Sequence, residues 1–358
     1  MSPGPAVPGT PLELGAFELE SGVRLPSVTA AYRTWGRLGP DGDNAVLVCH
    51  ALTGAADADR WWGALLGPGR ALDPERDFVV CSNVLGGCYG TTGPASARPG
   101  GGCWGGCFPA ITIRDIVRGQ AALLERLGVR RLRLVIGGSL GGMQVLEWAL
   151  GFPQQVEAIV PIAVSARHSA WCIALSEAQR QAIYADPRWR GGSYPADDAP
   201  EAGLAVARQM AMCTYRSRES LEPRFSRGAG PAGGFAVAGW LRHHGRSLVR
   251  RFDAASYVAL TRAMDTHDVG RGRGGWREAL ARVRARALVV SVDSDVLYPP
   301  VEQEELAAAL PNARLASLRS PHGHDAFLIE AEQVNRLVAE FRAGLHESEG
   351  REEGTWVA

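Results

Sequence analysis

The chain has 358 residues, of which 46% are hydrophobic and 21% are charged, a composition typical of a soluble globular enzyme. The 38 basic and 38 acidic residues cancel, so we expect neither a nucleic-acid partner nor attraction to an anionic membrane. All the basic residues are arginine, which excludes a Walker-type phosphate loop, a Schiff-base lysine and a Ser-Lys dyad.

The first part of the chain predicts a mixed sheet. Residues 1–12 are rich in Pro and Gly and are expected to form a disordered lead. Residues 17–20 and 27–35 predict two antiparallel strands around a turn at Ser21-Gly22. Three near-continuous apolar runs indicate strands buried on both faces, as a parallel sheet requires. These runs are residues 45–49, 78–81 and 132–136.

A helix is predicted over residues 112–128, because its apolar residues recur at helical spacing. Thr112 and Asp115 are suited to cap its start, and Gly128 to end it. A further helix is expected beyond Ser139, followed by a strand over residues 156–164.

Residues 165–281 lack apolar strands of comparable quality and predict a mostly helical insertion. Strands are then expected at 287–292 and 314–318, an amphipathic helix at 325–345, and a polar, frayed tail at 346–358. The sequence therefore predicts an α/β fold: a twisted, mostly parallel sheet with helices on both faces. Its core comprises residues 13–164 and 282–345, interrupted by the insertion.

A candidate nucleophile stands where the strand at 132–136 meets a helix. Gly137-Gly-Ser-Leu-Gly141 fits the pattern G-x-S-x-G, in which a sharp strand-to-helix turn lifts the serine above the sheet. The flanking glycines allow strained dihedral angles and close backbone contacts. The simpler interpretation is a glycine-rich turn that happens to contain Ser139.

A serine nucleophile needs a histidine base that is oriented by a carboxylate. In α/β hydrolases these follow the serine in the order acid, then histidine. The strand at 287–292 is followed by Asp293 and Asp295, and we favour Asp295 because it lies further into the loop. The strand at 314–318 leads to His322 and His324, and we favour His324 because Gly323 frees the backbone before it.

An oxyanion hole in this fold uses backbone N–H groups. We expect one from Leu140, the residue after the serine, and one from Leu52 in the loop His50-Ala-Leu-Thr-Gly54. The alternative is that the loop is only a tight turn.

Cysteine usage and hydropathy indicate a cytoplasmic protein. Seven cysteines, an odd number, do not suggest a secreted disulfide framework. Cys103 and Cys107 lack a second pair that would complete a zinc site, so we expect no metal. No apolar run is long enough to span a membrane, and we expect neither export nor membrane insertion.

Six motifs in order along residues 12–345 resemble the homoserine O-acetyltransferase family. They are His50-Ala-Leu-Thr-Gly54, Asn83-Val-Leu-Gly-Gly-Cys88 with Gly90-Thr-Thr-Gly-Pro94, Gly137-Gly-Ser-Leu-Gly-Gly-Met-Gln144, Thr214-Tyr-Arg-Ser217, Ser294-Asp-Val-Leu-Tyr-Pro299 and Gly323-His-Asp-Ala-Phe-Leu328. The resemblance implies an α/β-hydrolase fold with a helical lid at 165–281, a homodimer through that lid, and a triad of Ser139, Asp295 and His324. It also implies that Arg208 and Asp325 bind the acceptor amino acid.

The implied activity is a ping-pong transfer of an acetyl group from acetyl-CoA, a co-substrate, to L-homoserine in methionine biosynthesis, with no bound cofactor. Succinyl-CoA as donor and L-serine as acceptor remain open, because one methylene is worth only about 1–3 kcal/mol in a pocket. An ester hydrolase with the same triad is a further alternative. A non-catalytic ligand-binding protein of this fold is another, although it has no need of a triad.

Overall fold

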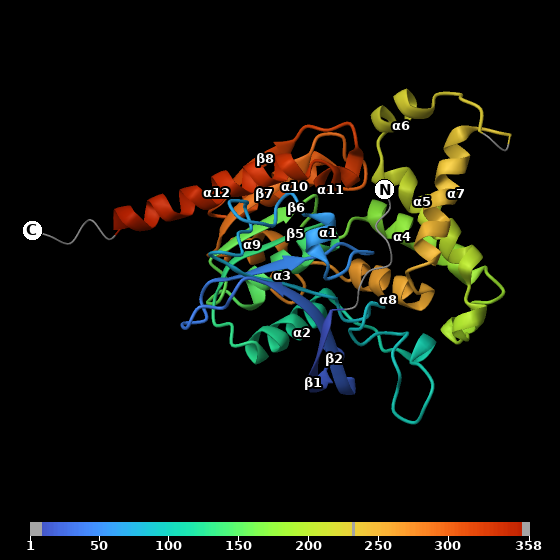
Figure 1. Ribbon diagram of the computed structural model, residues 1–358, viewed down its shortest axis with the longest axis horizontal. Helices are drawn as coiled ribbons and strands as arrows, with labels where there is room; N and C mark the ends of the chain where they lie inside the picture. Colours follow the sequence, from blue (N-terminus) through green and yellow to red (C-terminus); the bar gives the residue numbers. More distant parts are fainter. Residues whose placement is uncertain (1–8, 231–232, 353–358) are drawn as a thin grey trace, which may run out of the picture.

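The computed structural model describes residues 9–230 and 233–352, the last seven of these by their backbone only. An eight-stranded sheet forms its centre, in the order β1-β2-β4-β3-β5-β6-β7-β8 (Figure 1). The strands are β1 (Thr10–Glu18), β2 (Arg24–Trp35), β3 (Ala45–Cys49), β4 (Phe78–Ser82), β5 (Leu132–Gly138), β6 (Ala158–Ile162), β7 (Arg286–Val292) and β8 (Ala313–Leu318). The pairs β1–β2 and β2–β4 are antiparallel, and the other pairs are parallel. The predicted α/β fold is confirmed.

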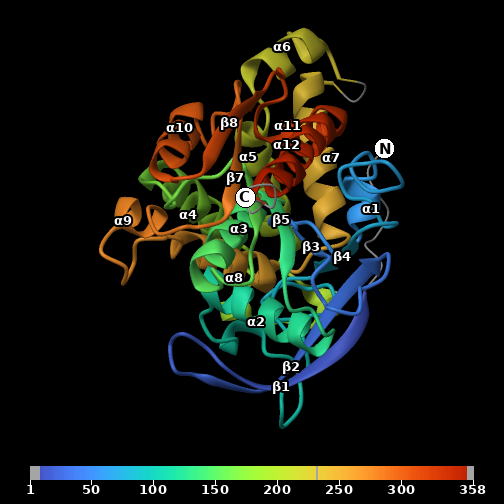
Figure 2. The same ribbon diagram turned by 90° about the vertical axis from the view of Figure 1, so that its left-hand side faces the viewer.

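Both faces of the sheet are covered, as the continuous apolar runs predicted. In β3, Ala45, Leu47 and Cys49 pack into one hydrophobic cluster, whereas Val46 and Val48 pack into another. Helices α2 (Ile113–Arg126) and α3 (Leu140–Gly151) supply the first cluster, and α12 (Ala331–Glu352) supplies the second (Figure 1 and Figure 2). Parallel pairing requires such crossover helices.

The predicted caps of α2 are confirmed. Thr112 accepts the N–H of Asp115, and the Asp115 carboxylate accepts the N–H of Thr112, which makes a capping box. Gly128 follows the end of the helix with a φ of 82°, a conformation that favours glycine.

The expected disordered lead over residues 1–12 is too long. Strand β1 begins at Thr10, which pairs with Tyr32 of β2. Pro11 is tolerated because β1 is an edge strand. On its outer side no neighbouring strand accepts hydrogen bonds, so the missing N–H of proline costs none there. Residues 1–8 lie outside the described part of the chain.

The predicted single helix over 325–345 is wrong. The chain instead forms a 3-10 turn η4 (Gly323–Asp325), the short helix α11 (Ala326–Ile329) and then α12. In a continuous helix the Phe327 carbonyl would accept the N–H of Ala331. Here it accepts the indole N–H of Trp62 at 2.9 Å. A contact from a distant segment therefore replaces the local helical bond.

The frayed tail expected over 346–358 is also too long, because α12 continues to Glu352. Residues 353–358 lie outside the described residues.

The described residues between β6 and β7 are mostly helical, and β6 is shorter than the predicted strand at 156–164. In the described residues outside this stretch also lie the helices α1 (Ala58–Trp61) and α10 (Pro300–Ala309) and the 3-10 turn η1 (Gly105–Cys107), whereas the 3-10 turns η2 (Arg190–Gly192) and η3 (Ala196–Asp198) lie within it. The helices between β6 and β7 are α4 (Ala170–Tyr184), α5 (Glu201–Tyr215), α6 (Arg218–Phe225), α7 (Ala236–Val249), α8 (Ala254–Asp265) and α9 (Trp276–Leu280). Helices α5, α6 and α7 project beyond one end of the sheet (Figure 1).

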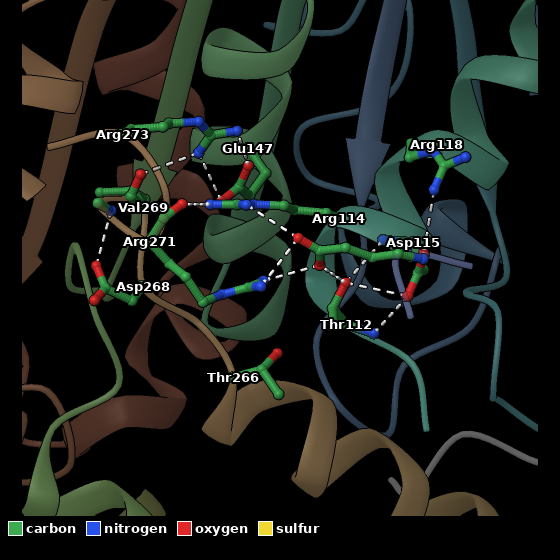
Figure 3. A network of polar contacts seen from close by, with 12 residues as sticks. Thr112, Arg114, Asp115, Arg118, Glu147, Thr266, Asp268, Val269, Arg271 and Arg273 are labelled. Atoms are coloured by element: carbon green, nitrogen blue, oxygen red, sulfur yellow. Dashed lines mark hydrogen bonds and ion pairs between the residues drawn. The ribbon is translucent and has the colours of Figure 1, made fainter. Parts of the chain in front are cut away.

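A polar network ties the end of this helical segment to the sheet domain (Figure 3). Glu147 of α3 is buried and accepts two hydrogen bonds from Arg273, at 3.0 and 2.8 Å. Arg114 of α2 donates to the same carboxylate at 3.3 Å and to the Arg271 carbonyl at 2.6 Å. The loop that carries Arg271 and Arg273 is therefore fixed to both helices on this face of the sheet.

Candidate active site

Ser139 occupies a strained turn between β5 and α3. Its φ of 58° and ψ of −124° lie outside the ordinary regions for a residue with a side chain. Gly137 and Gly141 let the turn approach β3, since a Cβ on either would lie 2.6 or 2.1 Å from the Cys49 carbonyl oxygen. The strain therefore persists because close packing enforces it. This is the geometry that exposes a nucleophilic serine above a sheet.

Asp295 and His324 meet near the same end of the sheet. His324 Nδ1 lies 2.7 Å from Asp295 Oδ2. The other carboxylate oxygen, Oδ1, accepts the N–H groups of Leu297 and Tyr298 at 2.8 and 3.0 Å. Because a carboxylate can only accept, Nδ1 carries the proton and Nε2 is left with a free lone pair. His324 Nε2 is buried and has no hydrogen-bond partner in the described parts of the chain.

Aromatic rings surround the His324 imidazole. The ring centroids of Tyr298, Phe327 and Tyr215 lie 5.3, 5.6 and 5.7 Å from its own. These contacts limit rotation of the imidazole and exclude water from its faces.

The alternative acid and base have other partners. Asp293 Oδ1 accepts the N–H of Ser320 at 3.0 Å, which fixes the loop before the histidines. His322 Nδ1 lies 3.1 Å from Ser220 Oγ at the start of α6. Neither residue lines the cavity that contains Ser139.

This cavity has a volume of about 190 Å³ and lies between the sheet domain and the helical segment, the residues 163–285 between β6 and β7. Its lining combines Ser139 and His324 with both apolar and charged side chains. The other lining residues are Ala51, Leu52, Thr53, Gly54, Ala55, Asp57, Arg60, Trp61, Arg208, Tyr215, Arg251, Asp325, Phe327 and Leu328. A small, partly apolar cavity with a few convergent polar groups is typical of a ligand site.

The two residues expected to donate to an oxyanion belong to the Ser139 turn and to the loop after β3. Leu140 is the first residue of α3, so its N–H has no acceptor within the helix. Leu52 lines the cavity from the loop after β3. These positions are compatible with two N–H groups that converge on a carbonyl oxygen.

Two comparisons decide the family. A family model described as the alpha/beta hydrolase fold matches residues 44–331. A homoserine O-acetyltransferase of Trichormus variabilis is 60% identical over 331 residues, which covers 92% of each chain. The chain belongs to the homoserine O-acetyltransferase family.

Solved structures share the fold along almost the whole chain. A homoserine O-acetyltransferase from Bacillus anthracis is 26% identical, with a TM-score of 0.87 and coverage of 94% of this chain and 98% of that one. The esterase E22 is 25% identical, with a TM-score of 0.86 and coverage of 93% and 99%. The same backbone therefore occurs in proteins named for acetyl transfer and for ester hydrolysis.

In this family member, the two residues expected to bind an acceptor have opposite charges and line the same cavity. Arg208 comes from α5 and lies over the Tyr215 ring, 5.1 Å from its centroid. Asp325 directly follows His324, and its Oδ2 lies 4.0 Å from Arg216 Nη1. Burial raises the pKa of Asp325, while Arg208 opposes that shift. A ligand with both a carboxylate and an ammonium group would complement this pair.

Sequence reasoning assigned no role to the side chains of three residues that shape the site, although two of them, His50 and Tyr215, lie in the motifs described above. His50 is buried, and burial lowers its pKa to about 4. Its Nδ1 lies 2.8 Å from the Ala51 carbonyl and its Nε2 accepts the N–H of Val84 at 3.2 Å, so it links two loops in its neutral form. Arg251 and Tyr215 line the cavity from the helical segment. No local pattern distinguishes Arg251 from the other arginines.

The described residues contain no group of three or more His, Cys, Asp or Glu side chains that could hold a metal ion. Among these residues there is also no helix long and apolar enough to cross a membrane.

Proposed function

We propose that this chain transfers the acetyl group of acetyl-CoA to the side-chain hydroxyl of L-homoserine, with Ser139, Asp295 and His324 as a catalytic triad. The observation that carries the proposal is the cavity in which Arg208 and Asp325 stand beside Ser139 and His324. A simple esterase site has no use for a cation and an anion placed for an amino acid. The name of the relative that is 60% identical supports the same reaction.

In the first half-reaction Ser139 Oγ bonds to the thioester carbonyl carbon, and His324 Nε2 takes its proton. The N–H groups of Leu140 and Leu52 stabilise the oxyanion. The C–S bond then breaks, His324 gives the proton to the sulfur, and coenzyme A leaves as a thiol. Asp295 stabilises the imidazolium in both steps through Nδ1.

In the second half-reaction homoserine binds with its carboxylate at Arg208 and its ammonium at Asp325. Its hydroxyl oxygen bonds to the acyl carbon while His324 removes the proton. The bond from that carbon to Ser139 Oγ breaks and the serine recovers its proton. Transfer competes with hydrolysis because the bound hydroxyl is oriented and the covered cavity limits water.

The test combines acetyl-CoA or succinyl-CoA with L-homoserine or L-serine and follows free thiol and O-acyl product by mass spectrometry. We expect thiol release to depend on homoserine and to be fastest with acetyl-CoA. Release at the same rate without any acceptor would support ester hydrolysis, the second candidate, which the likeness to esterase E22 favours. No release with any pair would contradict both.

The proposal extends to the assembly and to the setting of the enzyme. We expect a homodimer that associates through the helices at 165–281, acting as a lid, and a cytoplasmic role in methionine biosynthesis. Light scattering after size-exclusion chromatography should give twice the chain mass of 38.2 kDa. A monomer at micromolar concentration would contradict the dimer and leave the chemistry unaffected.

A further inference from the structure

We propose that Arg251 is a positioning residue for acyl transfer, because its guanidinium holds the loop at residues 50–54 so that the Leu52 N–H faces the reacting carbonyl. The inference rests on the proposed function, since it concerns the same acyl-serine chemistry.

Arg251 reaches from the helical segment into the sheet domain. It lies between α7 and α8, and its Nη1 donates to the Thr53 carbonyl at 2.6 Å and to the Tyr89 hydroxyl at 2.7 Å. Its Nη2 lies 3.4 Å from Thr53 Oγ1. Thr53 directly follows Leu52, so the guanidinium acts one residue away from the proposed oxyanion donor.

The loop is held at both ends, with Leu52 in the middle. At its start, buried His50 bonds to the Ala51 carbonyl and to the Val84 N–H. A turn follows, in which Gly54 donates its N–H to the Ala51 carbonyl at 2.8 Å. Arg251 supplies the second anchor at Thr53. The Thr53 carbonyl that Arg251 binds belongs to the same peptide as the Gly54 N–H, and that N–H bonds to the Ala51 carbonyl of the peptide that carries the Leu52 N–H. Loss of the Arg251 anchor would therefore loosen the turn that directs the Leu52 N–H toward the oxyanion.

The side chain of Tyr89 is suited to support the guanidinium. Burial raises the pKa of Tyr89 to about 12, so the phenol remains protonated and its oxygen accepts a hydrogen bond. Its ring packs edge-on against Phe252, with the centroids 5.7 Å apart. A planar fork can reach both Tyr89 and Thr53, whereas a lysine ammonium has no such fixed geometry.

This arrangement makes the oxyanion loop depend on the helical segment. Arg251 belongs to that segment, whereas Thr53 and Tyr89 belong to the sheet domain. When the helical segment packs against the sheet domain, Arg251 fixes the loop that carries the proposed oxyanion donor Leu52. The helices therefore support transition-state stabilisation in addition to covering the cavity.

The experiment compares Arg251→Ala and Arg251→Lys with a matched control, Arg250→Ala, whose arginine is the exposed neighbour in the chain. Two substrates are used: acetyl-CoA with homoserine, and p-nitrophenyl acetate, which lacks the coenzyme A moiety. For Arg251→Ala we expect kcat to fall about 10- to 100-fold with both substrates while KM changes little. Arg251→Lys should recover part of the loss, and Arg250→Ala should match the wild type.

Unchanged kcat in a folded Arg251→Ala would overturn the proposal. So would a loss confined to the KM for acetyl-CoA and absent with p-nitrophenyl acetate, because Arg251 would then contact the donor. If Arg251→Ala does not fold, Tyr89→Phe removes one acceptor alone; a several-fold lower kcat supports the proposal, and an unchanged one overturns it. Wild-type protein that hydrolyses the ester but makes no O-acetylhomoserine would refute the proposed transferase and still allow this comparison.

Discussion

The Asp295 carboxylate holds the His324 ring by a single 2.7 Å contact from Oδ2 to Nδ1, and neither side chain is more than 4% exposed. In the proposed mechanism a positive charge forms on this imidazole during acyl transfer, and the buried Asp295 carboxylate stabilises it. Replacement of Asp295 by Asn should keep the shape and remove that stabilisation. We expect kcat to fall about 10³- to 10⁴-fold, measured as thiol release from acetyl-CoA with homoserine.

Asp293→Asn is the matched control, since Asp293 bonds to the Ser320 N–H and does not line the cavity. It should retain activity within a few-fold of the wild type. Equal losses in the two variants would argue against Asp295 as the acid of the triad.

Substitution of the two histidines should separate the base from its neighbour. His324→Ala removes the imidazole that contacts Asp295, and its kcat should fall at least about 10³-fold. His322→Ala loses a contact with Ser220 outside the cavity and should retain most activity. The same thiol assay measures both, and the reverse order of losses would make His322 the base.

Arg208→Ala should weaken binding of the acceptor and spare the acyl-enzyme chemistry. A charge-assisted hydrogen bond is worth about 1.5–3 kcal/mol, so we expect KM for homoserine to rise about 10- to 150-fold. Hydrolysis of p-nitrophenyl acetate should remain near the wild-type rate. Asp325→Asn tests the ammonium site in the same way, and a loss of ester hydrolysis in either variant would point to damage of the triad.

Glu147→Gln should destabilise the protein, because it leaves Arg273 and Arg114 without the carboxylate that they share. Loss of one partner of a buried ion pair costs about 3–5 kcal/mol. Glu278→Gln is the control, since the exposed pair of Glu278 and Arg282 should contribute less than about 0.5 kcal/mol. Urea unfolding measures the free energy of unfolding of both variants. Similar values for Glu147→Gln and Glu278→Gln would mean that the Glu147 network does not stabilise the fold.

Buried His50 should make the protein sensitive to acid. Its folded pKa of about 4 lies below the ordinary value of 6.5. As pH falls through 6.5 the unfolded chain gains a proton that the folded chain does not bind, so stability decreases down to about pH 4 and no further. This group alone accounts for about 3 kcal/mol of the change in the free energy of unfolding.

Urea unfolding of wild type and His50→Gln at about pH 7 and about pH 4.5 measures this effect. The wild type should lose more stability between the two pH values than the variant. His243→Gln, which replaces an exposed histidine, should behave as the wild type. An equal pH dependence in wild type and His50→Gln would exclude His50 as the cause.

Local patterns in the sequence determined the sheet and the position of the candidate nucleophile. The run at 45–49 is apolar at every position, and the run at 132–136 is apolar except at Arg133, because both faces of each strand are covered. Gly137 and Gly141 indicate a turn in which the backbone lies too close to β3 for any larger residue. These features depend on residues that are neighbours in the chain, so they can be predicted from the sequence before the tertiary structure is known.

Only the tertiary structure decided which groups meet. Asp295, and not Asp293, contacts His324; Trp62 interrupts the predicted helix at 325–345; and Arg251 joins Thr53, although 198 positions separate them. Each of these outcomes depends on a hydrogen bond between distant segments, whose geometry is set by packing of the whole sheet and its helices. The sequence favoured Asp295 and His324 from their positions in the loops, but residue types and their spacing do not specify contacts between distant segments, and the structure showed which of these side chains meet.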